Sequence, residues 1–530
     1  MLINRGINTL AQAQNYLKPD ISGMHDPFEF SQMSKAVGLV KKACQNHDRV
    51  LVFGDYDVDG ITSTVLAKSV LTKMGLEVLH HLPHRVNEGY GLNFSAVNFA
   101  RENNVKLVVT ADCGTSSHKE IGALRQANID VVVTDHHEPQ DLSLPAASSM
   151  INPKLKNSGY AYRDLAGVGV VYKFAQALSG SSLIEELDLV TLGTVADSVP
   201  LTGENRIIVK EGIARFSTTQ RPGLRALMDK AGISDKKFSA TYISFIIAPR
   251  LNASGRMSSA ETSLKLLMSA ERAQADTLAA ELEAFNRQRQ KEEARILKEA
   301  EELINAEINF KDHKVIVIAK EDWHHGVLGI VASKLADRFY RPAIVISLSG
   351  DLCKGSGRSI ENFHLFDALE DCKESLESFG GHAHAAGLLI YKNNIDDFRK
   401  SINKLAHERL NIDDLLPGID VDMELRLADV SEDLAKECEL LEPFGMANPE
   451  PLFYSRNLKL KGQAQSLGRE TLKFWVTDGV ATMQVIGFGM SSLRQDLLNA
   501  QSIDLVYTLR LDNWQGASSL ILEAKEIFFK

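Results

Sequence analysis

Three apolar, strand-like runs in the first 140 residues each end in acidic residues, and this repetition constrains the fold more than any other feature. The runs are VLVF at 50–53, KLVVT at 106–110 and IDVVVT at 129–134. They are followed in turn by the clusters Asp55, Asp57 and Asp59, then Asp112, then Asp135, His136 and His137. A helix-like segment, SSHKEIGALRQAN, separates the second run from the third. Apolar runs alternating with helices predict an α/β fold with a parallel, doubly wound sheet, whose functional groups gather at the carboxyl ends of the strands. We therefore expect the three clusters to meet.

The first cluster calls for a cation, because neighbouring carboxylates disfavour one another's ionisation. DYDVDG matches the first half of a calcium EF-hand loop, but the twelfth position, which must be Glu, is Leu66. The preceding run is also strand-like rather than helical. The sequence thus excludes an EF-hand and predicts a strand, a turn at Gly60 and a helix from about Thr62 to Met74.

Asp and His without a thiolate suit Mn²⁺ or Mg²⁺ better than Zn²⁺. Six or seven such ligands fit two metal ions rather than one. Two adjacent metal ions are suited to phosphoryl transfer. Asp112, alone on its strand, is the natural bridging ligand. Asp197 follows a helix-like segment stopped by Pro200, and is either a helix-terminal acid or a further ligand. An alternative interpretation is that these residues are only surface acids at strand ends. It would not explain why His136 and His137 directly follow Asp135.

Bulk composition limits the class of protein. A chain of 530 residues predicts several domains. Five scattered cysteines without a Cys-x-x-Cys motif favour a reducing, cytoplasmic location and no structural zinc. No apolar stretch approaches the ~20 residues of a membrane span. A net charge of −10 argues mildly against nucleic acid as a partner, although a basic groove can lie apart from an acidic metal site.

The rest of the chain divides by pattern. No Gly or Pro occurs from Arg256 to His325, and an apolar stripe predicts a long helix from about Ala270 to Ala306. A strand–helix–strand pattern then restarts, and short strands with turn signals from about residue 415 predict a small β-barrel. The predicted division is an acid-bearing domain at 1–255, a connecting helix at 256–311, a second α/β domain at 312–408 and an OB-like barrel at 415–530.

Glycine-containing stretches supply candidate anion contacts, because glycine lets the backbone approach a phosphate closely. They are PHRVNEGYGLN with Arg85, PRLNASGR with Arg250 and Arg256, CKGSGRS with Ser356 and Arg358, and FGGHAHAAG with His382. Each stretch alone is weak evidence for an anion site, since a lone Arg in a turn is usually solvated. Phe474, Trp475 and Trp514 in the barrel could stack on bases or pack in its core, and the sequence leaves both open.

Taken in order, VFGDYDVDG, ADCG, VTDHHEP and LGTVADSVPLTGENR resemble the DHH phosphoesterase superfamily. The later PRLNASGR, WHHGVLGIVASKL, KGSGRS and FGGHAHAAG look like the DHH-associated second domain. With the barrel, the chain is similar over nearly its whole length to the bacterial single-strand-specific exonucleases of this superfamily. The resemblance implies 5′→3′ removal of mononucleotides from single-stranded DNA with two Mn²⁺ or Mg²⁺ ions. It also implies a role in DNA repair and recombination, with single-strand binding protein and a recombination helicase as partners.

The resemblance further implies residue roles. The metal ligands would be Asp55, Asp57, Asp59, Asp112, His136 and Asp197. Asp135 would orient a ligand and His137 would face the phosphate, so that Asp112, Asp135, His136 and His137 form the catalytic group. The DNA backbone or its 5′ end would contact Arg85, Arg256, Ser356, Arg358 and His382. The chain departs from the family pattern at His325, where Pro is expected, and at Ala447, where Gly is expected.

Two rival functions remain. A small-substrate DHH enzyme would cut short oligoribonucleotides or cyclic dinucleotides, but such an enzyme has no need of the roughly 115 residues after position 415. A DHH-type scaffold that binds DNA without cutting it would be expected to lose metal ligands, and this chain keeps them all.

Overall fold

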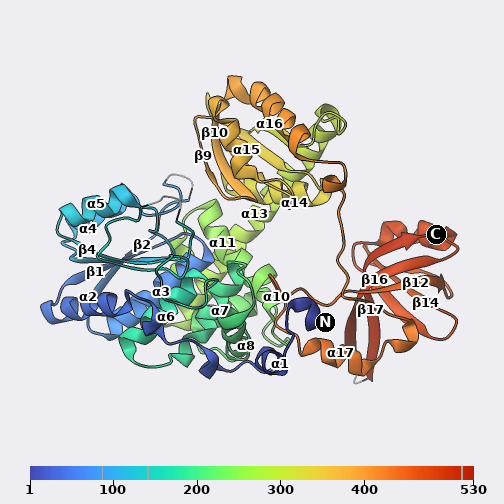
Figure 1. Ribbon diagram of the computed structural model, residues 1–530, viewed down its shortest axis with the longest axis horizontal. Helices are drawn as coiled ribbons and strands as arrows, with labels where there is room; N and C mark the ends of the chain where they lie inside the picture. The colour runs from blue at the N-terminus through green and yellow to red at the C-terminus, as the bar shows by residue number, and fades with distance from the viewer. Residues whose placement is uncertain (86–87, 140–142, 469, 515–516) are drawn as a thin grey trace.

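A five-stranded parallel sheet forms the centre of the first domain in the computed structural model, which describes residues 1–85, 88–139, 143–468, 470–514 and 517–530 (Figure 1). Its strand order is β2-β1-β3-β4-β5. The strands are β1 (Arg49–Gly54), β2 (Glu77–His81), β3 (Leu107–Ala111), β4 (Asp130–Thr134) and β5 (Ser149–Ile151). Val50 pairs with Leu107 and Leu107 with Asp130, so β1, β3 and β4 end at the same edge. The predicted parallel sheet is confirmed.

Helices cover both faces of this sheet. α2 (Met33–Asn46), α3 (Val58–Lys73) and α6 (Gly167–Ser179) pack into one core, and α4 (Phe94–Glu102) and α5 (His118–Gln126) into the other. α7 (Leu187–Ala196) and α8 (Gly203–Ser217) extend the first core, as do α9 (Pro222–Ala231), α11 (Ala248–Met257) and α12 (Glu261–Met268).

The helix after β1 begins earlier than predicted. α3 starts at Val58 rather than near Thr62, so Gly60 lies within the helix and not in a separate turn. The reason is the side chain of Asp57, which caps the helix by accepting a hydrogen bond from the Gly60 N–H at 3.0 Å. Asp59 is consequently in the first helical turn, where its carboxylate complements the helix dipole.

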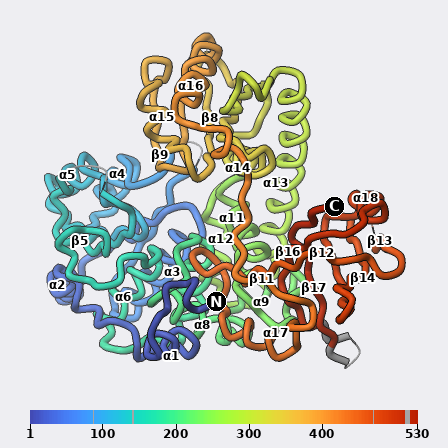
Figure 2. The backbone as a smooth tube through the Cα atoms, turned by 45° about the vertical axis from the view of Figure 1, so that its right-hand side comes forward, coloured from blue at the N-terminus to red at the C-terminus, as the bar shows by residue number. Residues whose placement is uncertain are grey.

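The predicted long helix is α13, which spans Arg272–Glu307 in 36 residues, a length of about 54 Å. Figure 2 shows it running from the first domain up to the second. Ala275 and Leu282 near its start belong to the core of the first domain. Ile296 and Ile304 near its end belong to a core shared with the second domain. One helix therefore sets the position of both domains.

The second domain has a mixed sheet of order β6-β7-β8-β10-β9. Its strands are β6 (Ile316–Glu321), β7 (Ala343–Leu348), β8 (Leu352–Arg358), β9 (Ser378–Gly381) and β10 (Ala385–Tyr391). The helices are α14 (Leu328–Phe339), α15 (Leu365–Asp371) and α16 (Ile395–Arg409). Glycines at 355 and 357 on β8 leave space for side chains of neighbouring strands, because an added Cβ at Gly355 would lie 2.9 Å from Leu388.

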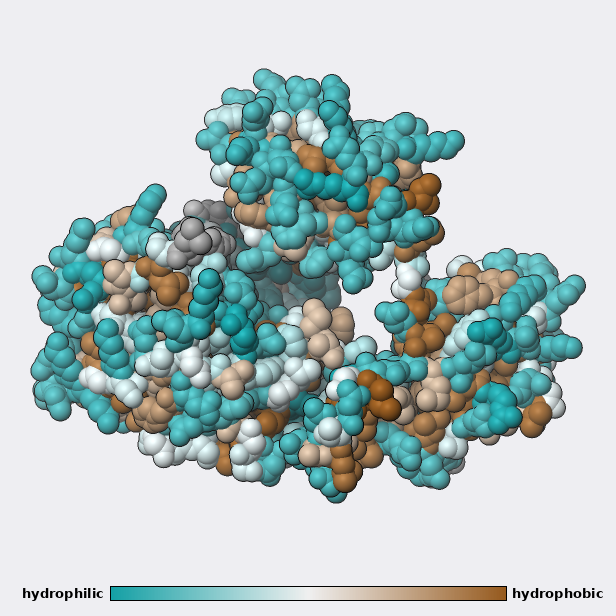
Figure 3. Space-filling model, viewed as in Figure 1, coloured by the Kyte–Doolittle hydropathy of each residue, from teal (hydrophilic) through white to brown (hydrophobic). Residues whose placement is uncertain are grey.

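The C-terminal domain is a barrel of order β11-β12-β16-β17-β15-β14-β13, closed by pairing of β12 with β14. Its strands are β11 (Met423–Glu424), β12 (Phe453–Leu460), β13 (Gln465–Leu467), β14 (Thr471–Thr477), β15 (Thr482–Gly487), β16 (Ile503–Trp514) and β17 (Ala517–Phe529). Two short helices, α17 (Glu432–Glu439) and α18 (Arg494–Asn499), complete it. An extended linker joins it to α16, and an opening separates the second domain from the barrel in the space-filling view (Figure 3).

The barrel also contacts the first domain. The buried Arg206 guanidinium of α8 donates hydrogen bonds to the carbonyls of Leu441 and Glu442 at 3.0 and 2.9 Å. It also lies over the Tyr16 ring, 3.8 Å from the centroid. Within the described residues, no helix is long and apolar enough to cross a bilayer.

Candidate metal centre and anion pocket

The predicted acidic clusters meet at the carboxyl edge of the parallel sheet. Their side chains form three overlapping groups whose ligand atoms lie within 4.8 Å of one another: Asp55 with Asp57 and Asp112, Asp112 with His136 and His137, and Asp59 with His136 and Asp197. His136 Nε2 lies 3.2 Å from Asp112 Oδ1 and 3.6 Å from Asp197 Oδ2. Asp112 and His136 each belong to two groups, so the three groups form one continuous cluster.

Backbone conformation aims Asp112 into the cluster. Its φ of +66° is in the left-handed region, which bends the chain directly after β3. Gly167 at the start of α6 leaves the space that the carboxylate fills, because an added Cβ there would lie 2.4 Å from Asp112 Oδ1. The first N–H groups of α6, at Gly167 and Val168, donate to the Asp59 carboxylate at 2.7 and 2.8 Å. The α6 N-terminus thus fixes two of the acids.

The electrostatics of the cluster favour bound cations. Burial and the neighbouring carboxylates raise the pKa of Asp55 and Asp112, and burial and Asp57 raise the pKa of Asp59 to about 7. Oδ1 of Asp55 and Oδ1 of Asp112 are buried without a hydrogen-bond partner among the described residues. Such carboxylates are costly to bury unless they coordinate a metal. The all-oxygen and imidazole donor set fits Mn²⁺ or Mg²⁺.

Asp135 orients its neighbours instead of joining a ligand group. Its Oδ1 accepts hydrogen bonds from the backbone N–H of His136 at 2.7 Å and of His137 at 3.1 Å, and lies 2.7 Å from His137 Nδ1. Burial opposes a charge on His137, but the Asp135 carboxylate outweighs it and raises the pKa of His137 to about 9. The Tyr90 hydroxyl lies 2.9 Å from the same Nδ1 atom. These contacts hold the His137 ring at the edge of the cluster.

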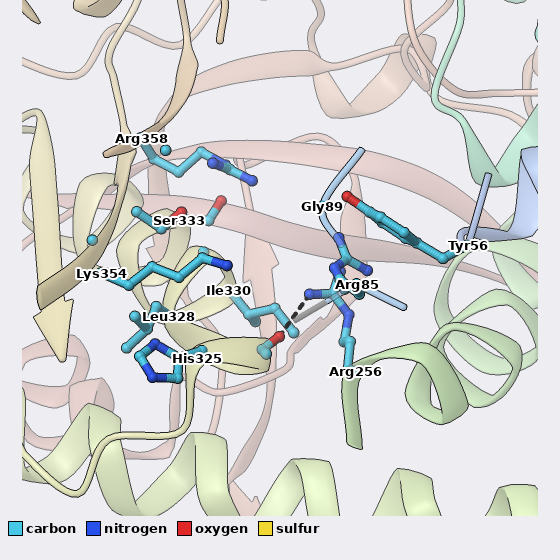
Figure 4. A pocket seen from close by; sticks show the side chains of 15 residues that line it. Tyr56, Arg85, Gly89, Arg256, His325, Leu328, Ile330, Ser333, Lys354 and Arg358 are labelled. Carbon is cyan, nitrogen blue, oxygen red and sulfur yellow. Dashed lines mark hydrogen bonds between the residues drawn. The ribbon is translucent and has the colours of Figure 1, made fainter. Parts of the chain in front are cut away.

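A basic pocket of about 430 Å³ adjoins the cluster between the two α/β domains (Figure 4). It begins at Tyr56, the residue between Asp55 and Asp57, whose ring carries the Arg85 guanidinium at 4.5 Å. The cations that line the pocket are Arg85, Arg256, Lys354 and Arg358. Ser356, Ser333 and the glycines at 326, 329, 355 and 387 complete its wall. In Figure 4 the Arg85 and Arg256 side chains face those of Lys354 and Arg358 across the pocket.

The pocket cations are short of negative partners. Burial and repulsion by Arg85 lower the pKa of Arg256 to about 9. Burial and Arg85 also lower the pKa of Lys354 and of Arg358. Within the described residues, Arg256 donates a hydrogen bond to the Gly326 carbonyl and Arg358 to the Gly357 carbonyl. Converging guanidinium groups with free forks suit a phosphate dianion.

Other predicted contacts lie elsewhere. Arg250 is structural, because it donates to Glu283 Oε2 at 2.8 Å and to the Ile246 carbonyl at 2.7 Å. His382 does not line the basic pocket but lies on the turn after β9, close enough to the acidic cluster that partial burial and His137 lower its pKa. Phe474 is in the barrel core and Trp475 is 43% exposed. The Trp514 side chain lies outside the described part of the chain.

Sequence reasoning missed three residues of this region, Tyr90, His325 and Lys354. Lys354 and Tyr90 lie in the segments CKGSGRS and PHRVNEGYGLN. The predicted anion contacts in these segments are Ser356, Arg358 and Arg85 only. His325, which stands where the family pattern has Pro, lines the basic pocket as the first residue of a 3₁₀ turn. The first position of a helical turn accommodates proline. His325 in its place keeps the turn and adds a polar ring.

Family models match three segments of the chain. The DHH family, N-terminal domain, matches residues 49–194, the DHHA1 domain matches 312–408 and the RecJ OB domain matches 421–526. These matches cover the parallel sheet, the mixed sheet and the barrel.

Curated relatives and solved structures are similar over nearly the whole chain. Single-stranded-DNA-specific exonuclease RecJ of Bacillus subtilis is 36% identical over 529 residues, 99% of this chain and 67% of that protein. RecJ of Escherichia coli is 34% identical over 543 residues, 98% of this chain and 93% of that protein. The crystal structure of Thermus thermophilus RecJ in complex with Mn²⁺ superposes with a TM-score of 0.85 at 28% identity, covering 99% of this chain and 74% of that one. A Mg²⁺ complex from the same organism gives a TM-score of 0.77.

Proposed function

The chain belongs to the RecJ family of single-stranded-DNA-specific exonucleases, and from this premise we propose that it degrades single-stranded DNA in the 5′→3′ direction, one mononucleotide at a time, with two metal ions. As a family member it is a metal-dependent exonuclease. The observation that carries the finer proposal is the adjacency of the acidic cluster to the basic pocket, which share the segment Asp55–Asp57.

Two of the three ligand groups support the ion count. Asp55 and Asp57 would hold one ion, Asp59, His136 and Asp197 the other, and Asp112 would bridge them. Divalent ions bound there would polarise the scissile phosphate, activate a water and stabilise the leaving oxygen. Asp135 keeps His137 oriented and charged, so that its imidazolium can face a non-bridging phosphate oxygen.

The basic pocket supports the polarity. Arg85, Arg256 and Arg358 would bind the 5′-terminal phosphate, one nucleotide from the metals. Water oxygen adds to the phosphorus of the next phosphodiester, and the bond to O3′ breaks, with O3′ taking a proton. The products are a 5′-mononucleotide and a strand with a new 5′-phosphate, which can enter the same pocket. The barrel supports a long strand over a dinucleotide as substrate.

The test is digestion of matched single strands labelled at the 5′ or the 3′ end. We expect labelled mononucleotide at once from the 5′ label and only late from the 3′ label, with no cleavage in excess chelator. Asp112→Ala should abolish hydrolysis while leaving most strand binding, because Asp112 belongs to two of the three ligand groups. Activity surviving in chelator would refute the metal site, and early release of a 3′ label would refute the polarity.

The cellular role follows from the same premise. We assign the enzyme to DNA repair and recombination, acting with single-strand binding protein and a recombination helicase. Stimulation of digestion by single-strand binding protein on long strands, absent on short ones, is the expected signature.

A further inference from the structure

A groove of about 960 Å³ lies between the first domain and the barrel. Ser198, the neighbour of Asp197, lines it directly. The same loop is tied to the barrel, because the Leu201 N–H donates to the Met446 carbonyl at 2.8 Å. The groove therefore reaches the loop that follows Asp197, whereas the basic pocket adjoins Asp55 and Asp57 through Tyr56.

A π-helical turn, Ile243–Ile247, forms one wall of this groove. The Ala248 N–H donates to the Ile243 carbonyl five residues earlier. Pro249 has no N–H to offer the preceding turn, which accounts for the wider winding. Such turns occur often at functional sites. The Arg250 guanidinium, itself bound to Glu283, donates to the Ile246 carbonyl, so the turn is held rigidly.

The π turn buries two of its side chains and presents a third. Ile243 and Ile247 are fully buried, whereas Phe245 is 76% exposed and lines the groove. On the opposite wall, the barrel loop contributes Phe444 and Met446, of which Met446 is 58% exposed. Exposed apolar side chains contributed by both domains to one groove indicate a binding surface.

The charges of the groove favour bases over phosphates. Its cations already have protein partners: Lys237 pairs with Glu439, Arg510 pairs with Glu450 and Glu523, and Lys210 donates to the Glu442 carbonyl at 2.9 Å. Hydroxyl groups of Ser239, Thr241 and Ser244 line the same wall as Phe245. A flat aromatic face with neutral hydroxyls suits stacking of any base, without sequence preference.

We propose that Phe245 is a stacking platform for a base on the 3′ side of the scissile phosphate, with Met446 opposite it. The inference rests on the proposed function, because the basic pocket then holds the 5′ end and the strand leaves past Asp197. Phe245 would position the downstream strand and set the affinity for strands longer than a dinucleotide, without taking part in the chemistry.

The test uses the full-length protein in chelator, where strands bind but are not cut. Phe245→Ala should bind a long single strand about 5- to 150-fold more weakly than wild type, the range for loss of one base stack. Phe245→Trp should restore binding. Phe28→Ala, a similarly exposed Phe in the first domain away from the groove, is the matched control and should bind like wild type.

Two further measurements separate stacking from other roles. The slope of log affinity against log salt should stay the same in Phe245→Ala, because no phosphate contact is lost. Strands with abasic sites downstream of the first nucleotide should bind wild type and Phe245→Ala alike. With metal restored, cleavage of a 5′-phosphorylated dinucleotide should be unchanged.

Equal long-strand affinity of Phe245→Ala and wild type would overturn the inference, as would an equal loss on abasic strands. A concentration-dependent change in mass of the variant would instead assign the groove to a second copy of the chain. Failure of the proposed function can be distinguished from failure of the stacking inference, because wild type would then leave even the dinucleotide uncut.

Discussion

At the scale of single residues, the basic pocket brings together guanidinium groups that face one another. Arg358 comes from β8 and Arg256 from the end of α11, and each hydrogen-bonds only to carbonyl oxygens within the described structure. Arginine suits a terminal phosphate because its planar fork binds two oxygens at once. The strength of each contact is therefore measurable on strands that differ only at the 5′ end.

Arg358→Ala should lower kcat/KM on 5′-phosphorylated strands about 10- to 150-fold, corresponding to a lost charge-assisted hydrogen bond of about 1.5–3 kcal/mol. Strands with a 5′-hydroxyl should be much less affected. The control is Arg338→Ala in the same domain, where the side chain is 60% exposed and pairs with Glu301 at the surface. Equal losses on both strand types would mean that Arg358 holds an internal phosphate.

Ala447 is a second residue with a measurable consequence. Its φ of +57° lies in the left-handed region, which explains why the family pattern has glycine there. Ala447→Gly should raise the free energy of unfolding by about 1 kcal/mol, because the strain of the left-handed conformation is removed. Ala280→Gly, at an exposed position inside α13, should lower it by a similar amount. Thermal unfolding of both variants checks the signs, and a destabilised Ala447→Gly would contradict the argument.

At the scale of elements, the metal cluster depends on close packing of helix ends against strand ends. α6 begins at Gly167 directly over Asp112, and α7 carries Gly193, where an added Cβ would lie 2.9 Å from Asp59 Oδ1. Neither glycine is needed for a turn. Each is required because a larger residue would displace a carboxylate.

Gly167→Ala should therefore reduce kcat/KM by about 100-fold, since a displacement of about 1 Å in a catalytic group has that effect. Apparent Mn²⁺ affinity should fall as well. Gly122→Ala in α5, where an added Cβ meets nothing within 4 Å, should leave activity unchanged and stability equal or slightly higher. Unaltered metal affinity in Gly167→Ala would show that Asp112 has room to move.

Much of this arrangement follows from local sequence. Buried strands ending in acids predict the sheet, and the sheet brings Asp55, Asp112 and His136 together without further information. The same reasoning misses the start of α3, because the Asp57 cap competes with a turn at Gly60. It also misses the π turn, whose winding depends on Pro249 and on Arg250 acting through the backbone. The meeting of the acidic residues is thus predictable from pattern, whereas the groove depends on contacts between distant parts of the chain.

At the scale of the whole molecule, contacts across hundreds of residues decide how the barrel lies on the first domain. Arg206 contacts Leu441 and Glu442, more than 230 positions away, and also donates to the Tyr16 carbonyl at 2.9 Å. No periodicity in the sequence points to this contact. The groove beside Phe245 exists because these bonds hold the barrel in place.

Arg206→Met should lower the free energy of unfolding by about 3 kcal/mol or more, because buried carbonyls lose a charged donor. Long-strand affinity should fall as the barrel loosens, while cleavage of a dinucleotide persists. The stability and long-strand affinity of Arg206→Lys should lie between those of Arg206→Met and wild type. Denaturant unfolding and strand binding measured side by side provide the check, and a variant with wild-type affinity for long strands would mean that the barrel is held by other contacts.

The basic pocket is built from two domains, with Arg85 on one side and Lys354 and Arg358 on the other. Like charges facing one another across a domain boundary favour separation until an anion lies between them. For the 5′-phosphate that we propose as this anion, binding the strand end and drawing the two domains together would be a single thermodynamic event. Linkage makes the relation reciprocal: whatever factor the phosphate contributes to closure, closure returns to the affinity for phosphate.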